Sequence, residues 1–75
     1  MERSEDRLAG AERRFREAET RVARQAAVVA ALEERGQEGA AERAREALVL
    51  METGVALARL CLIVELASRE DGPDG

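Results

Sequence analysis

The chain has 75 residues, among which there is no His, Lys, Trp or Tyr and only one Cys, one Phe and one Pro. A structural zinc site takes its ligands mainly from Cys and His, so this composition excludes one. Cys61 has no second cysteine to pair with inside the chain, which excludes an intramolecular disulfide. A chain this small is at most one domain, with a core that supplies only about 3 to 5 kcal/mol. Of the usual ways to strengthen such a core, self-association is the one left open.

No set of side chains in the sequence converges on a chemical reaction. A catalytic site needs a nucleophile, a base and an orienting group, or carboxylates spaced to hold a metal. Glu42 and Glu46 lie one helical turn apart but have no partnering His, so we interpret them as solvent-facing. We therefore expect a protein that is not an enzyme, with no catalytic residue, no metal and no cofactor.

The charge distribution argues against a nucleic-acid partner. The formal net charge is −4, and the acidic excess lies after residue 32. A duplex-binding surface needs a continuous basic stripe that displaces counterions. Here the basic residues of the first half alternate with acidic ones: Arg13, Arg14, Arg16, Arg21 and Arg24 stand among Glu12, Glu17 and Glu19. We interpret these charges as a solvated helix face.

Ala, Glu, Arg and Leu dominate the chain, a composition typical of long helices and coiled coils. Apolar residues recur at steps of three and four from Leu8 to Leu32, and again from Ala41 to Leu66. This spacing predicts two amphipathic helices. Gly36 stands where a helix C-terminus favours positive φ, and Gly39 follows closely, so the chain is expected to reverse there.

The predicted fold is therefore all-α, an antiparallel and coiled-coil-like two-helix hairpin. Its single domain covers residues 1–70, with a first helix over about 4–35, a turn at 36–39 and a second helix over about 40–69. Residues 71–75 combine Gly, Pro and Asp, and we expect them to form a disordered tail.

Antiparallel pairing of the two helices sets large side chains against small ones. A turn near Gly36 and Gln37 places Leu32 near Ala41 and Phe15 near Ala58. Gln25 is the one polar residue at a central position of this face. Its amide either fixes the register of the helices or turns outward to solvent, and both possibilities remain open.

The second helix carries further apolar residues beside those that face the first helix. We call them the second face; they follow the same steps of three and four and comprise Ala47, Leu50, Gly54, Leu57, Cys61 and Val64. Together the two faces cover an arc of about 160°, more than one neighbouring helix can bury. Small residues recur at every seventh position, Ala47, Gly54, Cys61 and Ser68, so another helix could approach closely.

We expect the second face to join two copies of the chain into a four-helix bundle, with a two-fold axis near Gly54 to Leu57. The homodimer would act as a structural or adaptor module. An unidentified protein partner would use the same residues. Cys61 is interpreted as a small apolar spacer, with a dimer-bridging disulfide or a sensor thiol as the alternatives.

A membrane-associated hairpin is the alternative function, because residues 47–67 are about as long as a bilayer span. Glu52, Arg59 and Glu65 fall inside this stretch, each at a cost of roughly 2.5 to 3.5 kcal/mol near the centre of a membrane helix. We therefore do not expect a membrane partner. A single thiol and no signal peptide lead us to expect a cytoplasmic protein.

The charged and apolar pattern resembles short helical-hairpin proteins of proteobacteria that have no assigned function. The residues that carry the resemblance are Ala11-Glu12-Arg13-Arg14, Glu17-Ala18-Glu19, Arg21-Val22-Ala23-Arg24-Gln25, Leu32-Glu33, Gly36, Ala44 and Leu48. The match spans Leu8 to Leu66. Related chains often carry His near the turn and in the second helix, and this chain has none. The resemblance implies a bacterial helical hairpin and no activity.

Overall fold

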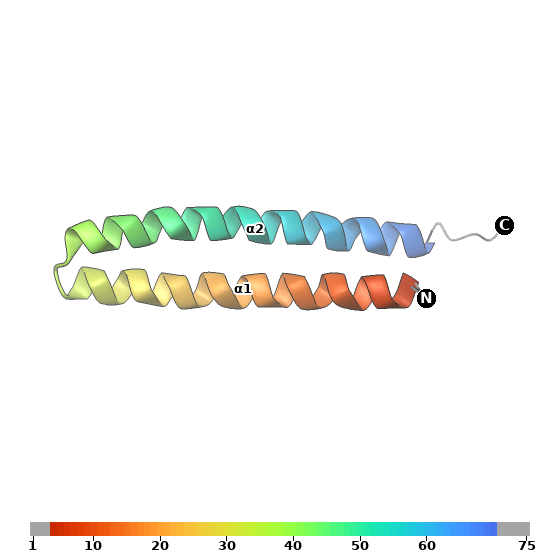
Figure 1. Ribbon diagram of the computed structural model, residues 1–75, viewed down its shortest axis with the longest axis horizontal. Helices are drawn as coiled ribbons and strands as arrows, with labels where there is room; N and C mark the ends of the chain where they lie inside the picture. The colour runs from red at the N-terminus through yellow and green to blue at the C-terminus, as the bar shows by residue number, and fades with distance from the viewer. Residues whose placement is uncertain (1–3, 71–75) are drawn as a thin grey trace.

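A computed structural model of the protein describes residues 4–70 as two long helices joined by a short turn (Figure 1). Helix α1 spans Ser4–Glu34 and helix α2 spans Glu38–Glu70. The helices run antiparallel and lie side by side along their whole length, which confirms the predicted all-α hairpin. The tail expected at residues 71–75 lies outside the described residues.

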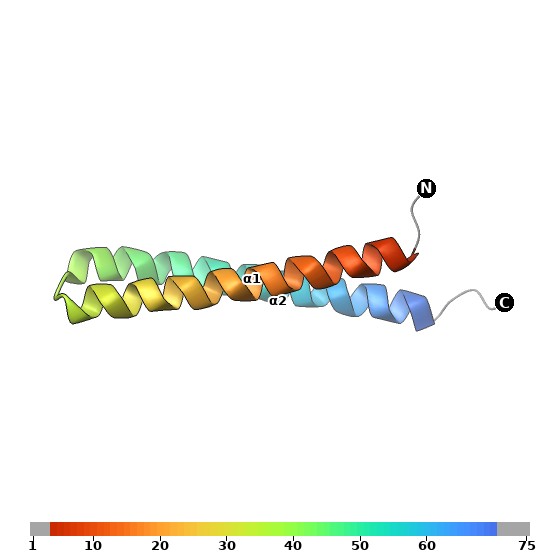
Figure 2. The ribbon, with the colours of Figure 1, turned by 90° about the horizontal axis from the view of Figure 1, so that it is seen from below.

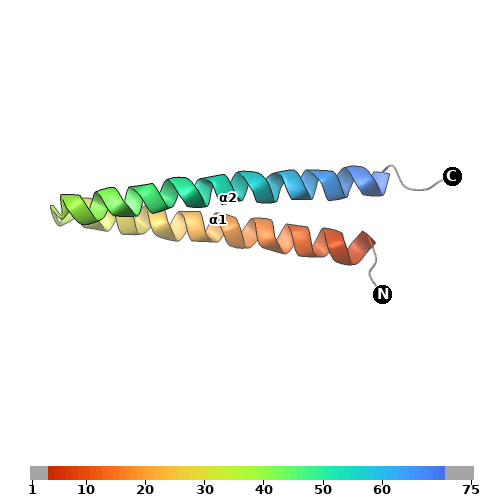
Figure 3. The ribbon, with the colours of Figure 1, turned by 45° about the horizontal axis from the view of Figure 1, so that its top comes forward.

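The two helices cross at a shallow angle near their middle when the hairpin is turned edge-on (Figure 2). Such a crossing is typical of coiled-coil packing, in which an apolar repeat of three and four residues stays in contact along a gentle supercoil. Within residues 4–70 no third element covers either helix (Figure 3). Each helix therefore has one neighbour and leaves the rest of its surface to solvent.

The turn is built from the C-terminal cap of α1. Gly36 has a φ of 74°, and its N–H donates to the Glu33 carbonyl at 3.0 Å. The Gln37 N–H donates to the Leu32 carbonyl, also at 3.0 Å, which completes a Schellman motif. The Ala41 N–H already donates to the Gln37 carbonyl at 2.9 Å, so the second helix has begun.

Helix α2 thus begins at Glu38, two residues before the expected start at Ala40. The reversal needs only one residue with positive φ, and Gly36 provides it, so Gly39 is free to join the first turn of α2. A carboxylate in a first helical turn is favoured by the helix dipole, which suits Glu38 to this position.

The core between the helices is shallow. Among the residues whose burial the structure describes, 6–69, no large side chain is fully buried. Five apolar side chains in this range are buried, three of them alanines: Leu8, Ala11, Val29, Ala41 and Ala44. The larger residues of the contact, such as Phe15, Val22 and Leu48, are only half-buried. Toward the turn, Val29 of α1 and both Ala41 and Ala44 of α2 are buried, and Leu32 is half-buried. Burial on this scale leaves the hairpin with little stability of its own.

Ion pairs join the helices near both ends. Arg45 pairs with Glu33 close to the turn, and Arg7 Nε lies 3.6 Å from Glu65 Oε1 near the open end. All four side chains keep contact with solvent, so each pair contributes at most about 1 kcal/mol. Their main effect is to favour one register of α1 against α2.

Replacing the turn glycine should destabilise the fold. We expect Gly36→Ala to lower the free energy of unfolding by about 1 to 2 kcal/mol, because a Cβ is disfavoured at positive φ. Urea denaturation followed by circular dichroism at one fixed protein concentration measures the change.

The matched control is Gly39→Ala. Gly39 lies within α2, and an added Cβ would meet no atom within 4 Å. This change should raise the free energy of unfolding by about 0.5 to 1 kcal/mol, because Ala is the better helix former. Equal losses in both variants would contradict the assignment of the turn to Gly36.

Candidate interaction surface

Helix α2 exposes most of the large apolar side chains. Eight such side chains in the described residues are at least 45% exposed, and only Val28 belongs to α1; the others are Val49, Leu50, Leu57, Leu60, Ile63, Val64 and Leu66. Isolated exposed apolar residues are normal in soluble proteins, whereas a contiguous set is characteristic of an interaction surface. In the described residues, the exposed large apolar side chains therefore gather on α2.

The second face lies on the side of α2 that α1 leaves uncovered. Leu50 is 73% exposed, Leu57 59% and Val64 58%, and Gly54 and Cys61 are exposed as well. Ala47 is half-buried at the edge of the contact with α1. One helix neighbour therefore leaves five of the six residues of the second face open to solvent.

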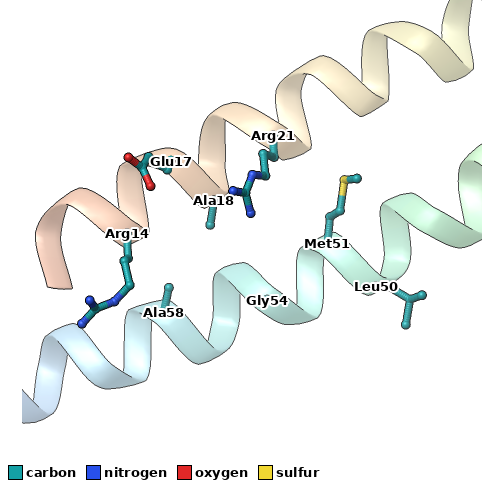
Figure 4. Close-up of a pocket in the computed structure, with 8 residues that line it drawn as sticks. All are labelled: Arg14, Glu17, Ala18, Arg21, Leu50, Met51, Gly54 and Ala58. Carbon is teal, nitrogen blue, oxygen red and sulfur yellow. The ribbon is translucent and has the colours of Figure 1, made fainter. Parts of the chain in front are cut away.

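The second face borders a groove of about 530 Å³ between the two helices (Figure 4). Its lining comes from both helices: Arg14, Glu17, Ala18 and Arg21 of α1, and Leu50, Met51, Gly54 and Ala58 of α2. Arg14 and Arg21 extend toward α2, whereas Leu50 points away from α1 (Figure 4). A Cβ added at Gly54 would meet no atom within 4 Å. The small residues in the middle of the lining therefore leave room for a side chain from outside.

The opposite side of the hairpin is less suited to another helix. Its groove is smaller, about 290 Å³, and both Glu19 and Glu52 line it. The Arg45 and Glu33 ion pair closes the same side near the turn. The two carboxylates at this smaller groove disfavour an apolar partner, so the side with the second face is the better candidate docking surface.

The sequence analysis missed a second group of exposed apolar residues on α2. Leu60, Ile63 and Leu66 are 55%, 51% and 45% exposed. The sequence signal is the uninterrupted apolar run from Leu60 to Val64, because five consecutive residues go all the way round a helix of 3.6 residues per turn. The second half of α2 is therefore apolar on more sides than two helix neighbours require.

Within the described residues, α2 over Glu38–Arg69 is long and apolar enough to cross a membrane, and none of its most apolar window is buried. A helix at a protein interface meets the same criteria of length and composition. These criteria alone therefore do not distinguish lipid from protein as the partner of α2.

Gln25 is a further residue that sequence reasoning singled out. It is half-buried, and its Nε2 donates to the Ala44 carbonyl of α2 at 2.9 Å. Of the two possibilities left open, the structure therefore shows the inward one. The amide ties the helices together at one relative position.

The acidic pair Glu42 and Glu46 is exposed on α2. Over residues 4–70 no group of three or more His, Cys, Asp or Glu side chains is placed to hold a metal ion.

Comparisons with protein-family models, with curated proteins and with solved structures find no match to this chain.

The hydrogen bond of Gln25 has a measurable effect on stability. We expect Gln25→Ala to lower the free energy of unfolding by about 1 kcal/mol, because it loses a half-buried hydrogen bond and side-chain packing. Gln25→Leu should recover most of this loss, since the Ala44 carbonyl keeps its helical hydrogen bond.

Arg24→Ala serves as the matched control for helix propensity, because Arg24 is exposed and Arg and Gln are similar helix formers. Urea titrations at one protein concentration compare the three variants with the native chain. Equal stability of Gln25→Ala and Arg24→Ala would show that the bond to Ala44 contributes nothing.

Proposed function

We propose that this protein is a non-enzymatic structural or adaptor module of the bacterial cytoplasm that self-associates through the second face of α2. Two hairpins would form a homodimeric four-helix bundle. The observation that carries the proposal is the exposure of Leu50, Leu57 and Val64 along one side of α2, at the spacing by which helices pack.

The direction of the second face on α2 fits a bundle. In a four-helix bundle each helix contacts two neighbours in adjacent directions. On α2 the residues that contact α1 include Leu48, Met51 and Val55, and the second face lies directly beside them in the heptad repeat. A second copy docked there would complete the bundle core that α1 and α2 begin.

The energetics support association of moderate strength. Full burial of an exposed Leu or Val contributes about 1.5 to 3 kcal/mol. Leu50, Leu57 and Val64 are partly covered already, so each contributes toward the lower end of this range. A symmetric dimer contains two copies of each of these side chains. The free energy gained by burying them all exceeds the free-energy cost of association, about 4 to 15 kcal/mol, in the lower part of that range. We therefore expect a dimer that dissociates on dilution.

A membrane-associated hairpin that uses residues 47–67 is the second candidate. Leu60, Ile63 and Leu66 favour it, because they extend the exposed apolar surface beyond the second face. Glu52 and Arg59 oppose it, since both are exposed and each costs roughly 2.5 to 3.5 kcal/mol at the centre of a membrane helix. The balance favours a protein partner.

A charge on the second face should split the dimer. Sedimentation velocity at about 100 µM measures the oligomeric state, because complexes of micromolar affinity are assembled at this concentration. The native chain should sediment with twice its 8.2 kDa mass. We expect Leu57→Glu to sediment as a monomer and to lose helicity, because a carboxylate would be buried without a partner.

Glu52→Gln is the matched control, since it changes a charge on α2 outside the second face and should alter neither property. A native chain that stays monomeric and fully helical at this concentration would overturn the proposal. So would equal effects of the two substitutions, because the assigned faces would then be wrong.

Lipid binding tests the second candidate. We expect the chain to remain in the supernatant when mixed with phosphatidylcholine vesicles that are then pelleted, because Glu52 and Arg59 resist insertion. Co-sedimentation of the native chain, or recovery of helical protein only in detergent, would favour the membrane-associated hairpin. The dimer proposal would then be abandoned.

A further inference from the structure

The second face of α2 alternates in size along the helix. Ala47, Gly54 and Cys61 are small, and each is followed three residues later by a large side chain, respectively Leu50, Leu57 and Val64. The order is therefore small, large, small, large, small, large. Read in the opposite direction the order is inverted, so that a reversed copy sets a large residue against every small one.

An antiparallel pair of α2 helices uses this inversion. With a two-fold axis midway between Gly54 and Leu57, the facing residues are Gly54 with Leu57, Leu50 with Cys61 and Ala47 with Val64. A parallel pair in register would instead set Leu57 against Leu57 and Gly54 against Gly54. Helices pack at native density when large residues face small ones, so the size pattern favours the antiparallel pair. The helix dipoles of neighbouring helices favour the same direction.

The structure provides the space that this pairing needs. The groove of about 530 Å³ is lined by Gly54 and by α2 residues on both sides of it, from Leu50 to Ala58. The position that a Cβ of Gly54 would occupy is open. Arg14 and Arg21 border the groove from α1 (Figure 4), so their aliphatic stems can cover an inserted leucine while the guanidinium groups remain in water.

We infer that two copies of the protein pair antiparallel through α2, and that Leu57 of each copy enters the groove at Gly54 of the other. The inference depends on the proposed self-association and adds its direction and register. It also predicts the distance between the two thiols of the dimer. Along the helix axis the two Cys61 residues lie 11 positions apart, about 16 Å at 1.5 Å per residue, too far for a disulfide.

Disulfide cross-linking tests the direction. On mild oxidation of the dimer, Leu50→Cys should form intermolecular disulfides with the native Cys61 of the second copy, whereas the native chain should form none. Thr53→Cys combined with Cys61→Ser places a thiol on α2 outside the second face and should not cross-link. Non-reducing gel electrophoresis, with the oligomeric state measured in parallel by sedimentation, reads the result.

The outcomes separate the inference from the proposed function. A native dimer that cross-links through Cys61 alone would show a parallel pair and overturn the inference, while self-association would stand. A native chain that is monomeric would overturn both. Cross-linking of Leu50→Cys, with a native dimer that stays unlinked, supports both.

A size exchange tests the register without a disulfide. Gly54→Leu fills the groove, and it should raise the dissociation constant roughly tenfold or more. At a protein concentration above the raised dissociation constant its helicity should be kept, because a Cβ at position 54 meets no atom within 4 Å and Leu is a better helix former than Gly. Adding Leu57→Ala restores a large residue opposite a small one and should bring the dissociation constant back to within about threefold of the native value. Failure of the second substitution to restore association would overturn the register.

Discussion

The structure depends on one mismatch: α2 has more apolar circumference than α1 can cover. The two helices bury mainly alanines and leave Leu50, Leu57 and Val64 in water. Removing such side chains from water is the main favourable term in association, so burying this exposed surface against a partner would lower the free energy. The thin core of the hairpin and the open side of α2 are consequences of the same distribution of apolar residues.

The two sides of the hairpin are not equivalent. On one side Glu33 and Arg45 join the helices, and Glu19 and Glu52 line the smaller groove. On the other side Arg14 and Arg21 of α1 and small residues of α2 line the larger groove, which lies beside the second face. This asymmetry favours one docking surface over two. It fits the dimer proposed above, because a single self-complementary surface would close after two copies.

Much of the fold could be predicted from periodicity alone. The steps of three and four from Leu8 to Leu32 and from Ala41 to Leu66 predicted two helices, and Gly36 predicted where the chain turns. The same steps identified the second face, whose large residues the structure leaves exposed. The exposed apolar surface at Leu60 and Ile63 was not predicted. Steps of three and four follow one face of a helix, whereas these residues belong to an apolar run that continues around it.

The sequence by itself determined the helices, the turn and the excess of apolar residues in α2, because these follow from local spacing and from the conformational freedom of glycine. The tertiary structure decided which way the Gln25 amide points and which side of the hairpin opens into a groove. Those features depend on the rotation of each helix about its axis. That rotation is set by the contact between the helices and not by either helix alone.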